Sequence, residues 1–442
     1  MGHNQIVYTV TLGELAEVPG APFAYWAPKS LRELFKKYPP LDRDVARMPD
    51  KPKIADVKQG LATADDLRFT RYWWEVPVEQ IGTSREETFR GKKWVPFAKG
   101  GKPFYHDIQL VVNWGRNGEE IKCRINPKTG RPFSNVWMLR QTEKEFFFRA
   151  GLAWVKSDYT EAQGIQPIDA RLMPAGTIFT AKQMGIFPNA SSFQKLAALC
   201  GFLNSKLAVR FASLVNPAGR SYEAGHIALL PIKQTILESA LLTRSVSHVH
   251  DLLREWATGD ESSTVFVAPW VLQLYRRWQG KGDVHLMPQT GHPLARDFEW
   301  RYGVPQQVMD WLSTEMEDGL SLRALAEACA KWETWLRQRI DEIQRQIDDE
   351  VYRIYGISDE DRKLIEAELT RTREEEPEAE GSGEQIDELE ETARDDVLTP
   401  EEHIRRLVHF LAHEAVKEDP DGIVPLQDCY PAGRVEMEPG LA

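Results

Sequence analysis

SLRALAEACAKWETWLRQRIDEIQRQIDDEVYRIY, residues 321–355, repeats apolar side chains at intervals of three and four residues. The repeated positions are Trp332, Leu336, Ile340, Ile343, Ile347, Val351 and Ile354. This spacing predicts one long amphipathic helix with a coiled-coil-like seam. At 1.5 Å per residue, about 35 residues form a rod of roughly 50 Å, which suits a spacer or a docking helix.

The residues before this rod fall into two classes. Helical periodicity extends over 236–257 and 267–278. Earlier in the chain, short β-like runs broken by Gly, Pro and Asn dominate, at 72–76, 107–114, 119–125 and 145–155. Two helices are predicted among them, at 30–38 and 191–214. We therefore predict an α+β protein, with a strand-rich mixed α/β domain at 1–235 and a helical, coiled-coil-like spacer at 236–372.

The end of the chain has a different composition. Residues 374–396 carry twelve acidic side chains against one arginine, together with Pro, Gly and Ser. Such a composition is typical of a solvated, flexible segment, so we predict an acidic linker at 373–397. A helix start at Thr399 to Glu402 then predicts a short helical tail at 398–442.

The net charge of −12 is distributed unevenly along the chain. Residues 1–235 hold 33 basic and 22 acidic side chains, a net charge of +11, which leaves 22 basic and 45 acidic side chains for the remainder. Because electrostatic binding depends on the local field, the first half is basic enough to bind a polyanion despite the acidic total.

Several site classes have no support in the sequence. The four cysteines, Cys123, Cys200, Cys329 and Cys429, have no paired spacing, which argues against disulfides and zinc. His409 and His413 lack a third ligand at a diagnostic spacing. No glycine-rich turn or Asn/Asp-Pro-Pro-aromatic loop for methyl transfer to adenine is present, so we assign no catalytic residue, metal or cofactor to this chain. With no long apolar run and no secretory pattern, we expect a cytoplasmic protein with no membrane partner.

One alternative is a magnesium-dependent nuclease. Asp107 is followed by Glu120 and Lys122, and we predict two strands joined by a turn at residues 115–118. An acid, then an acid-x-lysine on paired strands, is a common arrangement for holding Mg²⁺ and activating water. The motif is short, and charged hairpins carry it often.

Cations interleaved with aromatics in the basic half favour DNA contact instead. Arg68 and Arg71 flank an aromatic run, Lys92 and Lys93 precede Trp94, and further cations lie in loops rich in Gly, Asn and Pro. Cations in such loops neutralise phosphates, and Arg or Asn side chains read base edges. Strand alternation predicts that one of Trp73 and Trp74 faces the core.

The order of the motifs resembles the C-terminal part of large adenine-specific DNA methyltransferases of the PglX type, which serve BREX and related phage-defence systems, akin to fused Type II restriction-methyltransferases. The motifs are PGAPFAYW (19–26), KQGLATADDLRFTRYWWEV (58–76), WVPFAKGGKPFYHDIQLVVNW (94–114), GLAWVKSDY (151–159), RLMPAGTIF (171–179), CGFLNSKLAVRFASLVNP (200–217), GHIALLPI (225–232) and IDDEVYRIYGISDEDRKLI (347–365). Where that family usually has Thr-Gly, this chain has Thr63 and Ala64.

This resemblance implies a target recognition domain followed by a helical spacer, similar to Type I specificity subunits. Its partners would be double-stranded DNA, a methyltransferase subunit or domain that binds S-adenosylmethionine, and other proteins of the same defence system. The helical seam would offer a docking surface for that subunit. The expected DNA-contacting residues are Thr63, Arg68, Arg71, Lys92, Lys93, Lys99, Lys102, Arg116, Lys128 and Arg131. A protein-binding scaffold that does not touch DNA is the remaining alternative.

Overall fold

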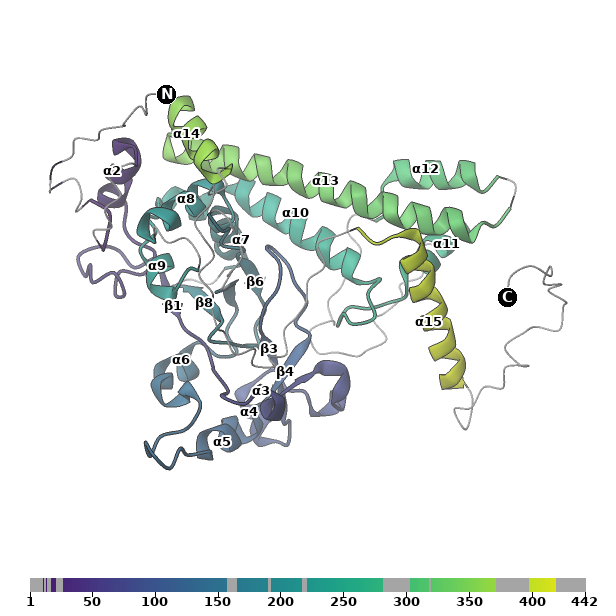
Figure 1. Ribbon diagram of the computed structural model, residues 1–442, viewed down its shortest axis with the longest axis horizontal. Helices are drawn as coiled ribbons and strands as arrows, with labels where there is room; N and C mark the ends of the chain where they lie inside the picture. The colour runs from purple at the N-terminus through teal and green to yellow at the C-terminus, as the bar shows by residue number, and fades with distance from the viewer. Residues whose placement is uncertain are drawn as a thin grey trace, which may run out of the picture.

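The computed structural model describes Thr11, Gly13 and residues 17–20, 27–156, 165–189, 192–216, 221–280, 303–317, 319–370 and 397–418. The predicted acidic linker at 373–397 lies outside this part except for residue 397, and so does the predicted tail after residue 418. Helices and two small sheets are both present, so the predicted α+β class is confirmed (Figure 1).

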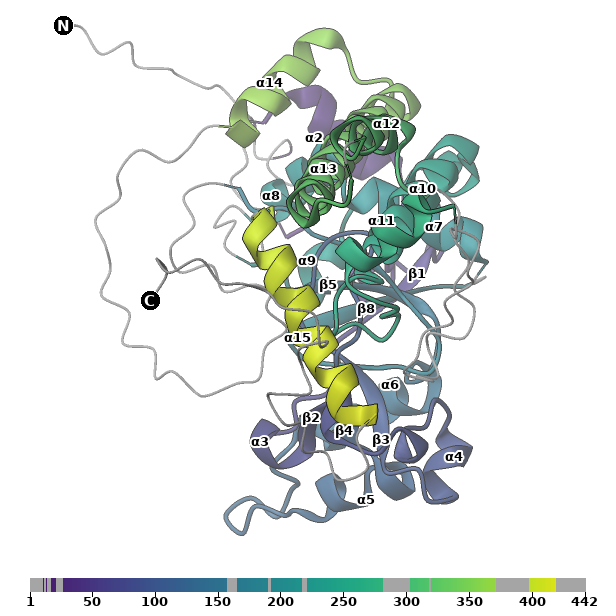
Figure 2. The same cartoon turned by 90° about the vertical axis from the view of Figure 1, so that its right-hand side faces the viewer.

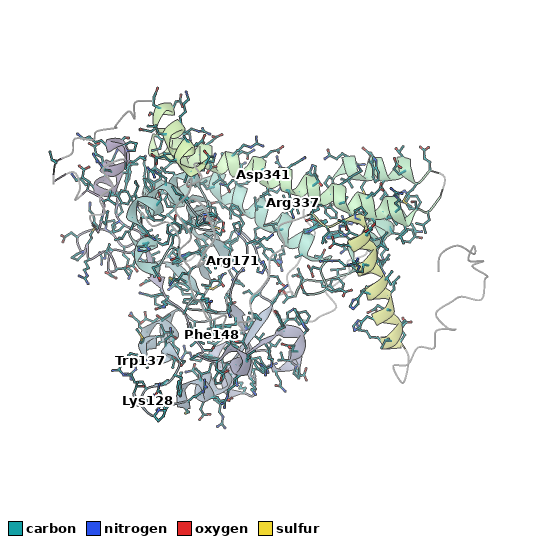
Figure 3. The ribbon with its side chains drawn as sticks, viewed as in Figure 1. Lys128, Trp137, Phe148, Arg171, Arg337 and Asp341 are labelled. Carbon is teal, nitrogen blue, oxygen red and sulfur yellow. The ribbon has the colours of Figure 1, made fainter. Side chains whose placement is uncertain are left out.

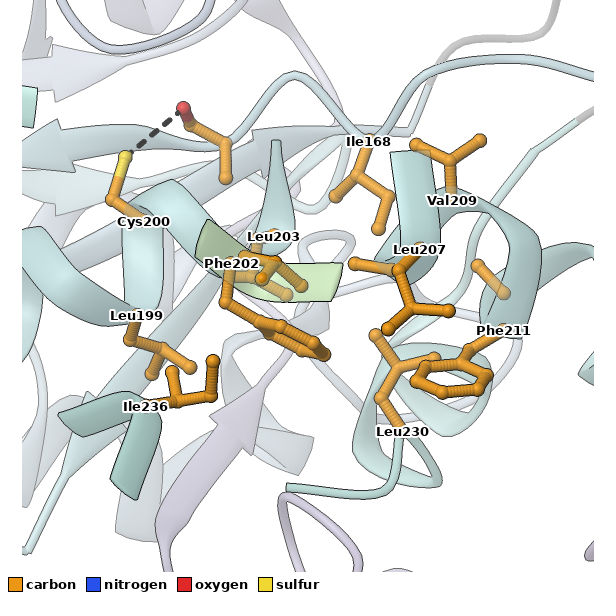
Figure 4. Packing of buried hydrophobic residues seen from close by; sticks show 14 of the residues in the cluster. Ile168, Leu199, Cys200, Phe202, Leu203, Leu207, Val209, Phe211, Leu230 and Ile236 are labelled. Atoms are coloured by element: carbon orange, nitrogen blue, oxygen red, sulfur yellow. Dashed lines mark hydrogen bonds between the residues drawn. The ribbon is translucent and has the colours of Figure 1, made fainter. Parts of the chain in front are cut away.

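The first sheet is antiparallel and has the order β1-β8-β5-β6. Its strands are β1 (Ala55–Lys58), β8 (Gln183–Pro188), β5 (Gly151–Val155) and β6 (Arg171–Met173). Leu152, Trp154 and Ile186 point from this sheet into the largest core cluster, which also contains side chains of the helices above it. Figure 4 shows part of that core, where Phe202, Leu207 and Phe211 pack together.

The second sheet has the order β2-β4-β3-β7. Its strands are β2 (Thr70–Tyr72), β4 (Leu110–Asn113), β3 (Trp94–Ala98) and β7 (Ile178–Phe179). β7 pairs parallel to β3, and the other neighbours are antiparallel. Phe97 and Val112 of this sheet share a core cluster with Ala153 and Phe187 of the first sheet. The two sheets therefore stabilise one strand-rich body.

Short helices surround the second sheet. They are α3 (Asp66–Phe69), α4 (Arg85–Phe89), α5 (Gly115–Cys123) and α6 (Arg140–Glu145), with single 3₁₀ turns at Trp73–Glu75, Val78–Gln80 and Asn135–Met138. The predicted strand at 119–125 is wrong, because residues 119–123 are helical. Arg116, Asn117 and Gly118 adopt left-handed φ values before this helix, and that turn sends the chain away from β4.

Helices α2 (Lys29–Lys37) and α9 (Ala224–Ala228) complete the strand-rich body with α7 (Phe193–Leu203) and α8 (Lys206–Val215). The helix predicted at 191–214 is in fact the pair α7 and α8, which meet at an angle of 68°. Ser205 explains the break, because its Oγ accepts from the backbone N–H of Ala208 and so caps the start of α8. The Asn204 side chain holds the same junction through both backbone groups of Ala170, at 2.8 and 2.7 Å.

In the part of the chain that the structure describes, no single helix has the length and apolarity to cross a membrane. Taken together, α7 and α8 pass that test by length and composition alone, and nearly all of their side chains are buried inside the protein.

The predicted helices beyond residue 236 are confirmed. They are α10 (Ala240–Ala257), α11 (Trp270–Trp278), α13 (Leu322–Tyr355) and α15 (Pro400–Glu418). The structure adds two helices that were not predicted, α12 (Gln306–Glu315) and α14 (Asp359–Thr370). In Figure 1, α10 and the long α13 run above the first sheet, and α15 descends from the other end of α13. The turned view in Figure 2 shows α7 and α10 between the first sheet and α13.

The apolar seam of α13 is covered by helices of the same chain. Ile343, Ile347 and Val351 are almost completely buried in the largest core, and Trp332 is buried in a cluster formed with α11, α12 and α15. The expectation that the seam is a free docking surface for a partner is therefore wrong. A periodic apolar pattern shows that a helix face is covered, but it does not show by which chain.

Candidate nucleic-acid interface

A ten-residue projection leaves the second sheet directly after α5, and we call residues 124–133 the finger. Its two arms are joined by backbone hydrogen bonds from Asn126 to Arg131 (2.8 Å) and from Phe133 to Arg124 (3.0 Å). At its tip, the Asn126 side chain accepts from the backbone N–H of Lys128 at 2.8 Å. An Asn side chain bonded two residues ahead fixes a tight turn, so the finger has a defined shape.

The finger lies within a strongly basic segment of the strand-rich half. Residues 121–142 contain five Lys and Arg side chains and no Asp or Glu. Lys122 pairs with Glu143 at 2.6 Å, and Arg124 pairs with Asp65 at 3.1 Å. The other three are exposed and form no ion pair within the described part of the chain: Lys128, Arg131 and Arg140. Their charge is therefore available to an external anion.

Exposed apolar side chains accompany these cations. Trp137 is 38% exposed and Met138 is 63% exposed, and Ile125 and Phe133 are also nearly half exposed. The Arg131 guanidinium lies 4.2 Å from the centre of the Trp137 ring, and that of Arg124 lies 4.9 Å from the Phe133 ring. Figure 3 shows Lys128 and Trp137 at the end of the molecule remote from α13, where Arg337 and Asp341 lie. Clusters of exposed apolar residues of this kind mark interaction sites.

The turn at residues 60–66 holds the base of the finger. Asn135 donates to the carbonyl of Gly60 at 2.9 Å, and its Oδ1 accepts from the backbone N–H of Ala62 at 2.8 Å. The Arg124 guanidinium donates to the carbonyl of Ala64. A Cβ at Gly60 would lie only 2.2 Å from a backbone oxygen of Phe179, so this approach requires glycine. The turn is thus a support for the finger.

Two of the expected DNA-contacting residues lie beneath the surface of this turn. Thr63 is buried, and its hydroxyl bonds the carboxylate of Asp66. Lys99 is buried as well, and its ammonium pairs with the other oxygen of Asp66 at 2.6 Å. The structure therefore offers neither group to a phosphate. The three residues form a network that fixes the turn against β3.

Three other expected residues already have partners within the chain; Arg68 is exposed, and Arg71 and Lys92 are half-buried. Arg68 donates to Glu120 at 2.8 Å, and this hydrogen bond lowers the pKa of the Glu120 carboxyl. Arg71 donates to the carbonyls of Leu67 and Thr70, and Lys92 to that of Glu79. A DNA contact by these side chains would exchange one partner for another.

Three further expected residues lie apart from the finger. The Lys93 ammonium lies over the ring of Trp94, at 5.3 Å from its centre. Arg116 projects from the left-handed turn before α5, with its side chain 75% exposed and 3.6 Å from Glu119. Lys102 lines a cleft between the second sheet and the helical half. Of the ten expected DNA-contacting residues, only Lys128 and Arg131 therefore lie together on one projecting element.

The cleft that Lys102 lines has a volume of about 1000 Å³. Side chains from both halves of the chain form its wall, among them Trp74, Arg337, Asp341 and Arg406. The loop at 259–263 closes one side and is bonded to the second sheet, since Trp73 donates to the Ser262 carbonyl at 2.9 Å. Acidic and basic groups alternate in the wall, so this cleft suits a polyanion less well than the finger does.

The predicted nuclease hairpin does not form. Asp107 precedes β4 and accepts hydrogen bonds from the backbone and hydroxyl of Thr264. Glu120 lies on helix α5 and bonds Arg68 and Asn113, and Lys122 pairs with Glu143. Each of the three side chains thus has its own structural partner. Within the residues that the structure describes, no group of three or more His, Cys, Asp or Glu side chains gathers around a position for a metal ion.

The sequence interpretation missed the apolar half of this surface, which comprises Ile125, Phe133, Trp137 and Met138. Periodicity could not identify them, because the finger and the 3₁₀ turn at Asn135–Met138 have no regular alternation. The acid-free run at 121–142 was not a sufficient signal either, because residues 88–106 and 170–222 also contain no Asp or Glu.

The comparison with known proteins points in one direction. No family model matches this chain. The chain is similar to an adenine-specific methyltransferase PglX of Lacticaseibacillus casei, with 27% identity over 329 residues, which cover 71% of this chain. The chain spans only about a quarter of the length of that relative, 25% of it being covered. The similarity thus supports a relationship to the PglX-type adenine methyltransferases.

Proposed function

We propose that this chain is the DNA-recognition part of an adenine-specific methyltransferase system for restriction-modification or phage defence. In this proposal the strand-rich residues 1–235 bind duplex DNA, and the finger is the element that enters the DNA surface. The observation that carries the proposal is the acid-free segment 121–142, which exposes Lys128, Arg131 and Arg140 without acidic partners among the described residues.

The physical reason is electrostatic. Duplex DNA carries one negative charge per roughly 1.7 Å of helix axis, so a projecting group of unpaired cations gains affinity by releasing condensed counterions. A carboxylate nearby would reduce that gain, and none occurs between Ile121 and Thr142. The +11 net charge of residues 1–235 adds a favourable long-range field.

The methyl transfer itself belongs to another domain or subunit in this proposal. That partner would bind S-adenosylmethionine, and this chain would supply specificity. The length of the PglX relative supports this division, because three quarters of that protein lie outside the matched region. Residues 236–372 would act as a spacer that holds the partner at a fixed distance from the DNA-binding half.

A salt titration of DNA binding tests the proposal. We expect the full chain to bind a labelled duplex with an affinity that falls linearly with salt on logarithmic axes. Replacing Lys128 or Arg140 by alanine should reduce the slope by about one each, because each change removes one phosphate contact. Arg323→Ala is the matched control, since Arg323 is equally exposed but lies on α13 and pairs with Glu327.

Three results would count against the proposal. If the chain binds no duplex at low salt, either alone or with the methyltransferase subunit, the DNA-recognition role is wrong. If it binds but both Lys128→Ala and Arg140→Ala keep the wild-type slope, DNA contacts a different surface. Co-purification of a methyltransferase without DNA binding would favour the scaffold alternative.

A further inference from the structure

The Arg131 side chain is positioned by a contact with an aromatic ring, in addition to carrying a positive charge. Its guanidinium lies over the indole ring of Trp137 at 4.2 Å from the ring centre, on a finger whose backbone is closed by the Asn126 to Arg131 hydrogen bond. A guanidinium over an aromatic ring is attracted to the ring face, and its N–H groups remain able to bind an external acceptor. No acidic side chain among the described residues occupies these N–H groups.

An arginine restrained in this way is preorganised to bind two hydrogen-bond acceptors that lie side by side in one plane. The guanidinium matches two oxygen or nitrogen acceptors side by side, and it loses less conformational freedom on binding when its plane is already fixed. In DNA, the major-groove edge of guanine presents such a pair, O6 and N7, and a phosphate presents another.

The apolar neighbours favour the guanine edge over the phosphate. Ile125 and Phe133 of the finger are exposed, and so is Met138, which follows Trp137 in the sequence. A phosphate contact would leave them in water, whereas entry into the groove would bury them against bases and thymine methyl groups. The two-armed shape of the finger also fits, since the major groove, about 12 Å wide, admits a two-stranded ribbon.

We propose that the finger enters the major groove and that Arg131, held over the ring of Trp137, reads one guanine through a bidentate hydrogen-bonded pair. This inference rests on the proposed DNA-recognition function and assigns one specificity-determining residue within it. Lys128 and Arg140 then neutralise phosphates on either side and contribute affinity without base preference.

The test begins with selection of the preferred duplex by the full wild-type chain from a random library. Arg131→Lys keeps the charge but loses the planar fork. We expect this variant to keep the wild-type salt slope and to lose about 5- to 100-fold of the preference for guanine at one position only. Trp137→Ala should weaken the same preference, because the guanidinium is no longer held. Arg323→Lys and Trp74→Ala, exposed residues elsewhere, are the matched controls.

Other outcomes overturn the inference in distinguishable ways. If Arg131→Ala lowers the salt slope and weakens binding equally for all sequences, Arg131 contacts phosphate only. If the wild-type chain binds DNA without any base preference, or if every variant keeps the wild-type preference, Arg131 does not read a base. Each of these results leaves DNA binding intact, although a wild type without base preference would also remove the specificity role. The absence of salt-dependent duplex binding removes the proposed function as a whole.

Discussion

Ala64 adopts a backbone conformation that favours glycine. Its φ is +61°, in the left-handed region, where a Cβ costs roughly 1–2 kcal/mol. Glycine would fit this position of the turn at residues 60–66 without strain. The alanine here is tolerated because Asn135 and the Asp66 network hold the turn from both sides.

We therefore predict that Ala64→Gly stabilises the protein by about 0.5–1 kcal/mol, since relief of the strain exceeds the added freedom of the unfolded chain. Denaturant unfolding of the full chain measures the change. Ala412→Gly on the exposed face of α15 is the matched control, and it should destabilise by a similar amount because its φ is helical. Equal destabilisation by both changes would contradict the strain at Ala64.

Gly101 lies directly against a buried arginine. A Cβ at Gly101 would lie 1.7 Å from Nη1 of Arg171, whose side chain is almost fully buried and bonded to Gln183. We predict that Gly101→Ala destabilises the protein by about 3 kcal/mol or more, since the added Cβ displaces a buried guanidinium from its hydrogen bond to Gln183. Gly91→Ala is the control, because Gly91 has a similar φ of +98° with open space around it. A loss no larger than that of Gly91→Ala would show that Arg171 moves aside.

The sequence identified side chains with suitable chemistry, but it did not show whether they are buried or already bonded to another residue. The expectation that one of Trp73 and Trp74 faces the core is confirmed, with Trp73 buried and Trp74 half exposed. Thr63 and Lys99 have side chains suited to binding phosphate, but both are buried and bonded to the carboxylate of Asp66. That pairing brings Lys99 to a residue 33 positions earlier, and the sequence alone contains no sign of it.

At the scale of elements, the junction of α8 and α13 contains a buried carboxyl. Asp348 accepts from the backbone N–H of Lys206 at 2.8 Å and from Gln344 at 3.3 Å, and its burial raises its pKa to about 6. Because this pKa exceeds the unfolded value of 3.8, the contribution to stability is fully present below about pH 4. It is lost as the pH rises through about 6.

We predict that Asp348→Asn, which keeps the acceptor without the charge, gains about 1–3 kcal/mol relative to the wild type between pH 4 and pH 8. Urea unfolding at four pH values across that range measures the difference. Asp341→Asn on the exposed side of the same helix is the control. Parallel pH curves for the wild type and Asp348→Asn would show that the burial has no energetic consequence.

Elements with strong periodicity were predicted correctly, including the whole of α13 and α10. The errors lie where local backbone geometry overrides the pattern. Three successive left-handed residues, Arg116 to Gly118, turned an expected strand into helix, and a single cap at Ser205 divided an expected helix into two. Such caps and turns depend on contacts with distant residues, here Thr88 for Asn117 and Asp348 for Lys206.

At the scale of the whole molecule, the helical half is not a detached rod. Its seam is buried against α7, α10, α11 and α12, and the loop at 259–263 is bonded to the second sheet. The DNA-binding candidate is instead the finger, at the end of the molecule remote from α13 (Figure 3). In the proposed function, the finger would contact DNA at the end of the molecule opposite the helical half.

Hydrogen exchange with and without a saturating duplex tests the central claim most directly, because it reports where on the full chain DNA binds. The account predicts slower exchange on DNA binding in peptides that cover residues 121–142, with no change along α13. Protection of α13 or α15 by DNA, with residues 121–142 exchanging as in the free chain, would contradict it.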